Sequence, residues 1–192
     1  MRYSADHKAQ THDRIVKEAA ARFRRDGIGA TGLQPLMKAL GLTHGGFYAH
    51  FKSKDELVET ALQAATDELT EVCEKAFAKQ KPLHSFIDTY LSPTHRDSPE
   101  KGCPLPTMAA ELGQRGQPSA IIDRGVEDRL GRIAATLSAE DADEQAVVML
   151  STLVGALMLS RSVEDPQLSL RILDTARKAL KLQADGACQA LP

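Results

Sequence analysis

Apolar residues recur at helical spacing along most of the chain, and no run alternates β-branched and polar residues as a half-buried strand does. Ile15, Ala19 and Phe23 follow one another every four residues, which predicts a first helix with one apolar stripe that ends at Gly27. The same pattern predicts about nine helices in all. The others cover residues 33–40, 43–50, 53 onward, 83–91, 104–113, 118–137, 142–163 and 166–182. We therefore predict an all-α fold.

The fourth of these helices has the best defined start. Ser53 and Glu56 form a capping box, in which the hydroxyl and the carboxylate accept from the free amides of the first turn. The polar stretch 92–102 contains two prolines and is predicted to be a mobile loop, and the residues from Ala184 onward are predicted to fray.

Charge is distributed unevenly along the chain, although its net value is only -2. Residues 1–54 hold ten Lys and Arg against four Asp and Glu, whereas residues 55–192 hold fourteen against twenty-two. This asymmetry favours a polyanion-binding head on an acidic body, which we expect to be two domains linked by the fourth helix. The alternative is a solvated surface with chance clustering.

Several function classes find no support in the sequence. Cys73, Cys103 and Cys188 show no disulfide or metal-ligand spacing, so we expect no metal, no cofactor and a reducing cytoplasm. The N-terminus lacks the apolar core of a secretion signal. The apolar stretch 146–160 is short for the ~20 residues that cross a bilayer, which indicates a buried helix and no membrane. No nucleophile elbow or phosphate loop points to an enzyme.

Two short helices joined by a glycine turn are predicted between Thr31 and Lys54. Gly41 can take the left-handed conformation that ends the first helix, and Thr43 can cap the second. Pro35 is tolerated in the first of these helices if Gly32 is the N-cap, because the amide at the third position has no intrahelical partner. The pattern is therefore that of a helix-turn-helix.

Residues 11–60 resemble the N-terminal domain of the TetR family. The resemblance lies in the turn at Gly41, the aromatic pair Phe47-Tyr48 and the sequence Phe51-Lys52-Ser53-Lys54. It implies a three-helix DNA-binding domain followed by a helical effector-binding and dimerisation domain. It also implies a homodimer that binds an inverted-repeat operator, represses by default, and is released by a small molecule. The alternatives are an enzyme or binding protein that carries a helix-turn-helix, and a DNA-packaging protein without an effector.

The resemblance places the DNA contacts in and around the second short helix. Gly45 and Gly46 would admit the floor of the major groove, and Lys54 with the helix N-terminus behind it would address a phosphate. Close packing against the first helix is the alternative for the glycines, a half-buried ring for Tyr48, and an ordinary exposed lysine for Lys54. The predicted DNA-binding residues are Thr31, Gln34, Thr43, His44, Gly45, Gly46, Tyr48, His50 and Lys54.

An effector pocket is expected among the middle helices. Aromatic residues are few beyond Lys54, so we expect an aliphatic lining and a small, compact or chain-like apolar effector. The predicted pocket residues are Phe86, Tyr90, Cys103, Thr107, Met108 and Glu111. Cys103 is either an electrophile sensor at a helix N-terminus or a buried inert cysteine.

The last two helices are more apolar than one monomer can cover, so two copies are expected to form an intermolecular four-helix bundle. Purely internal packing is the alternative. The predicted interface residues are Val147, Leu150, Ser151, Val154, Gly155, Met158, Leu168, Ile172, Ala176 and Leu180.

Overall fold

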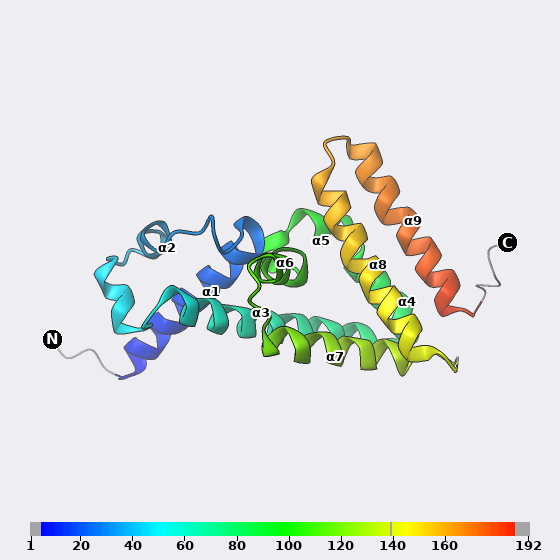
Figure 1. The fold of residues 1–192 in the computed structure, drawn as a ribbon, viewed down its shortest axis with the longest axis horizontal. Coiled ribbons are helices and arrows are strands. Elements are labelled where there is room, and N and C mark those ends of the chain that lie inside the picture. Colours follow the sequence, from blue (N-terminus) through cyan, green and yellow to red (C-terminus); the bar gives the residue numbers. More distant parts are fainter. Residues whose placement is uncertain (1–4, 139, 187–192) are drawn as a thin grey trace. The chain divides into compact units, whose positions relative to one another are not determined.

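The computed structural model describes residues 5–138 and 140–186, and regular structure in these ranges is entirely helical (Figure 1). The all-α prediction is therefore confirmed. In chain order the elements are α1 (Ala5–Asp26), α2 (Leu33–Ala39), the 3₁₀ helix η1 (Gly45–Ala49), α3 (Lys54–Phe77), α4 (Pro82–Tyr90), α5 (Pro93–Asp97), the 3₁₀ turn η2 (Pro99–Lys101), the π-helical turn η3 (Leu105–Ala109), α6 (Ala110–Gln114), α7 (Ala120–Ala134), α8 (Ala142–Ser162) and α9 (Pro166–Ala184). Cys188 and the predicted frayed end beyond residue 186 lie outside the described residues.

Backbone contacts divide the chain into two compact units. The first contains residues 1–68 and 99–121, and the second contains residues 69–98 and 122–192. The division falls inside α3, later than the expected boundary at residue 54. It also assigns the segment 99–121 to the unit that holds the predicted helix-turn-helix.

In the first unit, α1 buries the apolar stripe that the sequence predicts. Ile15, Ala19 and Phe23 are fully buried, and Gly27 ends the helix with a φ of 91°, a conformation that glycine adopts without strain. The helix packs against α2 and against the turns η2 and η3. The core of this unit is therefore built around α1.

The stretch 92–102 is helical, so the prediction of a polar loop is wrong. Ser92 caps α5 by accepting from the amide of His95 at 3.1 Å, and Pro93 occupies the first turn, where its missing N–H costs nothing. Pro99 opens η2 in the same way. The predicted helix over residues 104–113 also differs, because it begins as the π-helical turn η3 and continues as α6. Pro93 and Pro99, which indicated a loop in the sequence, each begin a short helix in the structure.

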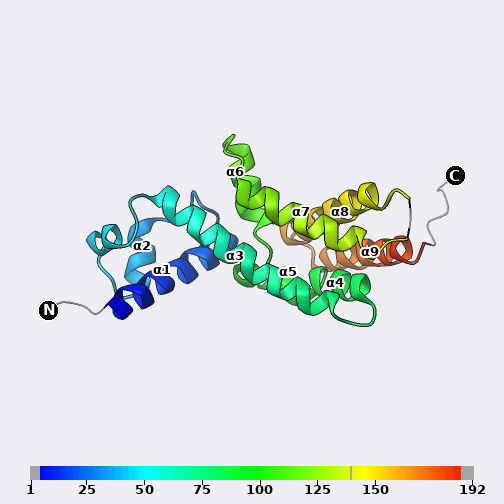
Figure 2. The same cartoon turned by 90° about the horizontal axis from the view of Figure 1, so that it is seen from below.

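The second unit is organised around the pair α8 and α9, with α4 packed against both (Figure 2). The Ser169 hydroxyl donates to the carbonyl of Ser160 at 2.6 Å and ties the two long helices together near their connection. The Arg161 guanidinium donates to the carbonyls of His95 and Arg96 at 2.6 and 3.0 Å, which attaches α5 to α8.

The apolar stretch 146–160 lies within α8, whose 21 residues agree with the predicted helix over residues 142–163. By length and composition alone α8 could cross a membrane, but such a helix is weak evidence because core helices pass the same test. Met149, Leu153 and Leu157 are fully buried, whereas Val148 and Leu159 are exposed. The helix therefore contributes to the core on one side and leaves apolar side chains uncovered on the other.

Candidate nucleic-acid interface

The turn between α2 and η1 has the geometry that the sequence predicts. Gly41 has a φ of 72°, in the left-handed region, and the amide of Leu42 donates back to the carbonyl of Met37 at 2.9 Å. The Thr43 hydroxyl accepts from the amide of Gly46 at 3.1 Å and caps the next helix. That helix, η1, is shorter and more tightly wound than the predicted range 43–50. Two glycines in five residues account for this, because glycine weakly supports an α-helix.

Pro35 occupies the third position of α2, since Gly32 is the extended N-cap that precedes Leu33. The amide that proline lacks would have no partner at this position, so the predicted reason for tolerating Pro35 is confirmed. The helix buries Leu36 and Met37 and leaves Gln34 exposed.

A stack of rings anchors η1 in the first unit. Phe47 is fully buried, and its ring stacks on Phe51 with centroids 5.5 Å apart. His12 of α1 stacks on the other side of Phe51 at 4.7 Å. The next residue, Tyr48, is 60% exposed and touches Phe47 only edge-on at 5.2 Å, so the alternative of a half-buried core ring is wrong.

Neither Gly45 nor Gly46 is packed against another helix. A Cβ added at Gly45 would meet nothing in the described chain within 4 Å, and one at Gly46 would meet only the Thr43 hydroxyl oxygen, at 3.3 Å. Close packing against α1 therefore does not explain these glycines. Thr43, His44 and Gly45 are exposed, and with Tyr48 they give η1 an outer surface of hydroxyl, imidazole and bare backbone.

His50 is half-buried at the end of this surface. Burial lowers the pKa of its imidazole, and the neighbouring His12 and Lys8 lower it further. A lowered pKa keeps the ring neutral near pH 7, so His50 can offer hydrogen bonds to a base edge or phosphate without a full positive charge.

Thr31 belongs to the fold and does not reach the outer surface. Its side chain is 5% exposed, and its hydroxyl donates to the carbonyl of Gly27 at 2.7 Å. The expectation that Thr31 contacts DNA is corrected accordingly, because the hydroxyl stabilises the connection between α1 and α2.

Lys54 also bonds within the protein. Its ammonium donates to the carbonyl of Ile28 at 2.6 Å, and burial followed by the positive charge of Arg115 lowers the pKa of Lys54. The Ser53 hydroxyl caps α3 by accepting from the backbone amide of Glu56 at 3.1 Å. The Glu56 carboxylate in turn accepts from the backbone amide of Lys52 at 2.5 Å. The capping box is confirmed, while Lys54 has a role in holding the loop after α1.

Glu111 of α6 holds the same loop from the other side. Its two carboxylate oxygens accept from the amides of Ile28 and Gly29 at 2.6 and 2.8 Å, and it pairs with Arg115. A Cβ at Gly29 would lie 2.9 Å from the carboxylate, so this close approach requires glycine. The expectation that Glu111 lines an effector pocket is corrected. Together with Lys54 it forms what we call the loop clamp: Lys54, Glu111, Arg115 and the backbone of residues 28–29.

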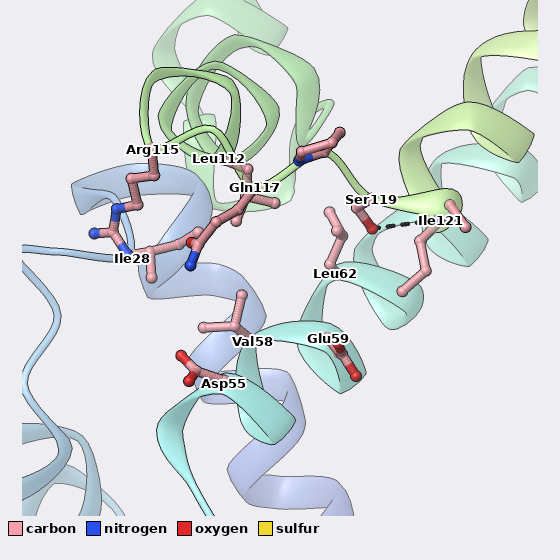
Figure 3. Close-up of a pocket in the computed structure, with 12 residues that line it drawn as sticks. Ile28, Asp55, Val58, Glu59, Leu62, Leu112, Arg115, Gln117, Ser119 and Ile121 are labelled. Atoms are coloured by element: carbon pink, nitrogen blue, oxygen red, sulfur yellow. Dashed lines mark hydrogen bonds between the residues drawn. The ribbon is translucent and has the colours of Figure 1, made fainter.

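An open cleft of about 470 Å³ lies next to the loop clamp (Figure 3). Asp55, Val58, Glu59 and Leu62 project into it from α3, facing Ile28, Leu112, Arg115, Gln117 and the segment that leads into α7. None of the six predicted pocket residues lines this cleft.

The remaining predicted pocket residues are divided between the units. Cys103 and Met108 are buried in the first unit with Thr107 half-buried, while Phe86 and Tyr90 are buried in the second. The structure does not bring the six together in one unit. Cys103 is 1% exposed, which favours the inert cysteine over the electrophile sensor.

Arg24 is a residue whose role the sequence reasoning missed. It is 4% exposed and pairs with Glu68 at 2.8 Å, and it also donates to the carbonyl of Gly102 at 3.4 Å. It follows Ala20 by four residues, at the edge of the apolar stripe, and this position could have indicated a buried arginine.

The buried aromatic anchor, the glycine turn and the outward-facing short helix define a helix-turn-helix domain of the DNA-binding type. Residues 15–61 match the model of the bacterial regulatory proteins of the tetR family. An HTH-type transcriptional regulator of Mycobacterium tuberculosis, Rv0196, is 26% identical over 181 residues, which cover 88% of this chain and 91% of that protein. The HTH-type transcriptional repressor KstR2 of Mycolicibacterium smegmatis is 34% identical over 88 residues, 46% of this chain and 38% of KstR2.

Solved structures extend the likeness to the whole chain. A TetR transcriptional regulator from Chloroflexus aurantiacus is 26% identical with a TM-score of 0.77, covering 91% of this chain and 94% of its own. A TetR-family regulator from Cytophaga hutchinsonii shares the fold at 17% identity, with a TM-score of 0.76 over 93% of this chain and 97% of its own. Residues 15–61 therefore form a helix-turn-helix domain of the TetR type, and over 91% of its length the chain is similar to a TetR transcriptional regulator, a class of DNA-binding proteins that are not enzymes.

Proposed function

We propose that this regulator is a ligand-responsive repressor that binds an inverted-repeat operator as a homodimer in the cytoplasm. The observation that carries the proposal is the outer surface of η1. A Cβ at Gly45 would meet nothing in the described chain, one at Gly46 would meet only the Thr43 hydroxyl, and Tyr48 is exposed. A helix without side chains at its first two residues can approach the floor of the major groove closely, and the flanking polar groups suit base edges and phosphates. Repression is favoured by the similarity to KstR2, itself named a repressor.

The proposed DNA-contacting set is Gln34, Thr43, His44, Gly45, Gly46, Tyr48 and His50. It omits Thr31, whose hydroxyl is bonded inside the fold, and it gives Lys54 an indirect role through the loop clamp.

Dimerisation is supported by the uncovered side of α8 and α9. A groove of about 570 Å³ is lined by residues of both helices, among them Gly155, Ala156 and Leu159 of α8 and Leu168, Ile172 and Ala176 of α9. Val147, Ser151 and Met158 are exposed as an interface requires, and Val154, Leu168 and Ala176 are half-buried. Leu150 and Leu180 are 5% and 2% exposed, so they pack within the protomer and are removed from the proposed interface.

The loop clamp offers a route by which the effector controls DNA binding. Residues 28–29 lead directly into α2, and α6 holds them through Glu111. A ligand that favours a different position of α6 would shift this loop and with it the helix-turn-helix. Such a ligand must bind the two conformations with different affinities, because equal binding shifts no population.

Footprinting on the DNA upstream of the neighbouring genes tests the proposal. We expect protection of two half-sites separated by about one helical turn, ~34–36 Å, or a multiple of it. The same protein is titrated against random duplex at several salt concentrations as a control. Equal affinity for all sequences would contradict the proposal and favour the DNA-packaging alternative.

A further inference from the structure

Two charged side chains are buried in the described chain, Arg24 and Arg129. Arg24 has the expected partner, because the Glu68 carboxylate lies 2.8 Å from it. Arg129 of α7 is 2% exposed and lies in the second unit, in which no Asp or Glu is buried among the described residues. A buried charge without a counter-charge is strongly unfavourable, so Arg129 requires an explanation that Arg24 does not.

The hydrogen bonds of Arg129 leave one side of its guanidinium unused. Nη1 donates to the carbonyl of Gly125, one turn earlier in α7. Nε and Nη2 are buried and find no partner in the part of the chain that the structure describes. The nearby acids do not compensate, because Asp128 and Glu74 both pair with Arg132, at 2.8 and 3.5 Å.

The two unused nitrogens are the pair that suits a carboxylate. The N–H bonds of Nε and Nη2 point the same way along one edge of the planar guanidinium, which matches two carboxylate oxygens. Two other arginines of this chain use that edge. Arg25 donates from Nε and Nη2 to the Asp26 oxygens at 2.8 and 2.7 Å, and Arg96 donates likewise to Asp97 at 2.7 and 3.2 Å.

We propose that Arg129 binds the carboxylate of the effector, and that the effector is an apolar carboxylic acid. The inference rests on the proposed ligand response and adds the chemical class of the ligand. The apolar part follows from the composition of the unit: every buried residue of α4 and α8 except Ser160 is apolar or aromatic, and none is an acid. The carboxylate supplies the counter-charge that the described chain does not provide for Arg129.

The test measures binding without DNA. The Tm of the full-length protein is recorded with linear alkanoates of four to fourteen carbons, phenylacetate and cholate, and with the matching alcohols or methyl esters. We expect at least one carboxylate to raise the Tm by roughly 5–10 °C at about 100 times its Kd, while its neutral analogue does not. The shift should be lost in Arg129→Met and retained in Arg132→Met, which removes the half-buried arginine three residues away that already pairs with Asp128 and Glu74.

A second readout avoids dependence on the folding of a variant. The ¹⁵Nε–¹H resonance of Arg129 in the wild-type protein, assigned with Arg129→Lys, should move when the active carboxylate is added. The proposal is overturned if no carboxylate changes the Tm, if Arg129→Met keeps the whole shift, or if the Nε resonance does not move. An equal effect of inorganic phosphate or sulfate would also overturn it, since the site would then accept any anion.

Operator release is measured separately, so that the two proposals can fail independently. Carboxylate binding at Arg129 without operator release would contradict the ligand-responsive function and leave the inference standing. Operator release by a neutral ligand alone would leave the function standing and overturn the inference.

Discussion

Gly46 lies where a side chain would meet only the hydroxyl of Thr43 and would otherwise project outward from η1. The fold therefore does not require this glycine, and neither does it require Gly45 beside it. We attribute the two glycines to the close approach of the operator DNA to η1. On this basis the glycines are the residues whose substitution best separates DNA binding from stability.

Replacing Gly46 by Leu should abolish specific operator binding and leave folding and assembly intact. Loss of a good base contact costs ~1–3 kcal/mol, so we expect a decrease in operator affinity of about tenfold or more, read from gel-shift titrations beside the Tm. Gly131→Leu is the control, because Gly131 lies on α7 and a Cβ there would meet nothing within 4 Å in the described chain. Equal losses in both variants would contradict the assignment of η1.

His95 makes stability depend on pH. Burial lowers the pKa of its imidazole, the charge of Arg161 lowers it further, and the bond to the Tyr90 carbonyl at 2.7 Å opposes the shift. Because the folded pKa lies below the ordinary value near 6.5, the unfolded chain binds the proton first as the pH falls. The stabilisation is therefore complete above pH 6.5 and is lost as the pH falls through the folded pKa.

We expect the free energy of unfolding to decrease between pH 7 and pH 5, with a slope of at most about 1.4 kcal/mol per pH unit for this one group. His95→Asn keeps a donor for the Tyr90 carbonyl but cannot titrate, so its urea-unfolding profile should be flatter. In this variant the free energy of unfolding should still depend partly on pH, since the pKa of His50 is lowered as well. Parallel pH profiles of the two proteins would contradict this account of His95.

At the scale of elements, the segment 99–121 packs on α1 and contacts the loop that precedes α2 through the loop clamp. The Glu111 carboxylate accepts two backbone N–H groups of the loop that precedes α2, and Lys54 donates to the carbonyl of the same loop. Hydrogen bonds to charged groups contribute about 1.5–3 kcal/mol each, more than neutral ones. The loop clamp is thus an element-level link whose removal should loosen the loop without unfolding the unit.

Glu111→Gln should increase the amide hydrogen-exchange rates of Ile28 and Gly29 by about tenfold or more, because the carboxylate that accepts both amides is lost. Operator affinity should fall several-fold at the same time, since α2 follows this loop. Glu127→Gln, on the exposed side of α7, removes an equal charge and should change neither quantity. Unchanged exchange at residues 28–29 would show that the clamp does not restrain the loop.

At the scale of the whole molecule, the exposed apolar side of α8 favours an interface with a partner. Val148 and Leu159 are 56% and 59% exposed on a helix whose opposite side is fully buried. A second copy of the same pair of helices would cover this side by two-fold symmetry, as in an isologous four-helix bundle.

Leu159→Glu should weaken dimerisation by about thirtyfold or more, the effect of losing an interface residue worth ~2 kcal/mol. The side chain is exposed in the protomer, so the Tm of the monomer should not fall. Sedimentation equilibrium measures the dimer constant, and Val72→Glu on α3 serves as a control because Val72 is a similarly exposed apolar residue. If Leu159→Glu and wild type have the same dimer constant, the interface lies elsewhere.

The sequence by itself determined the features whose physical causes are local. The helical stripe of α1, the left-handed turn at Gly41, the Thr43 cap and the capping box at Ser53 all depend on residues within about four positions of one another. These features sufficed for the all-α class and for the helix-turn-helix. The helices within the stretch 92–102 escaped local reasoning, because prolines also occur in loops.

Only the tertiary structure decided the roles of Lys54, Glu111 and Arg129. Lys54 reaches a carbonyl 26 residues away, and Glu111 reaches amides 83 and 82 residues away. Such contacts depend on how the helices pack, and the spacing of residues along the sequence does not show this packing. For Arg129 the structure decided something further, since the Nε–Nη2 edge of a buried guanidinium was found without a carboxylate in the described chain. A charge pattern along the sequence cannot distinguish that arginine from a solvated one, because burial and pairing are properties of the folded chain.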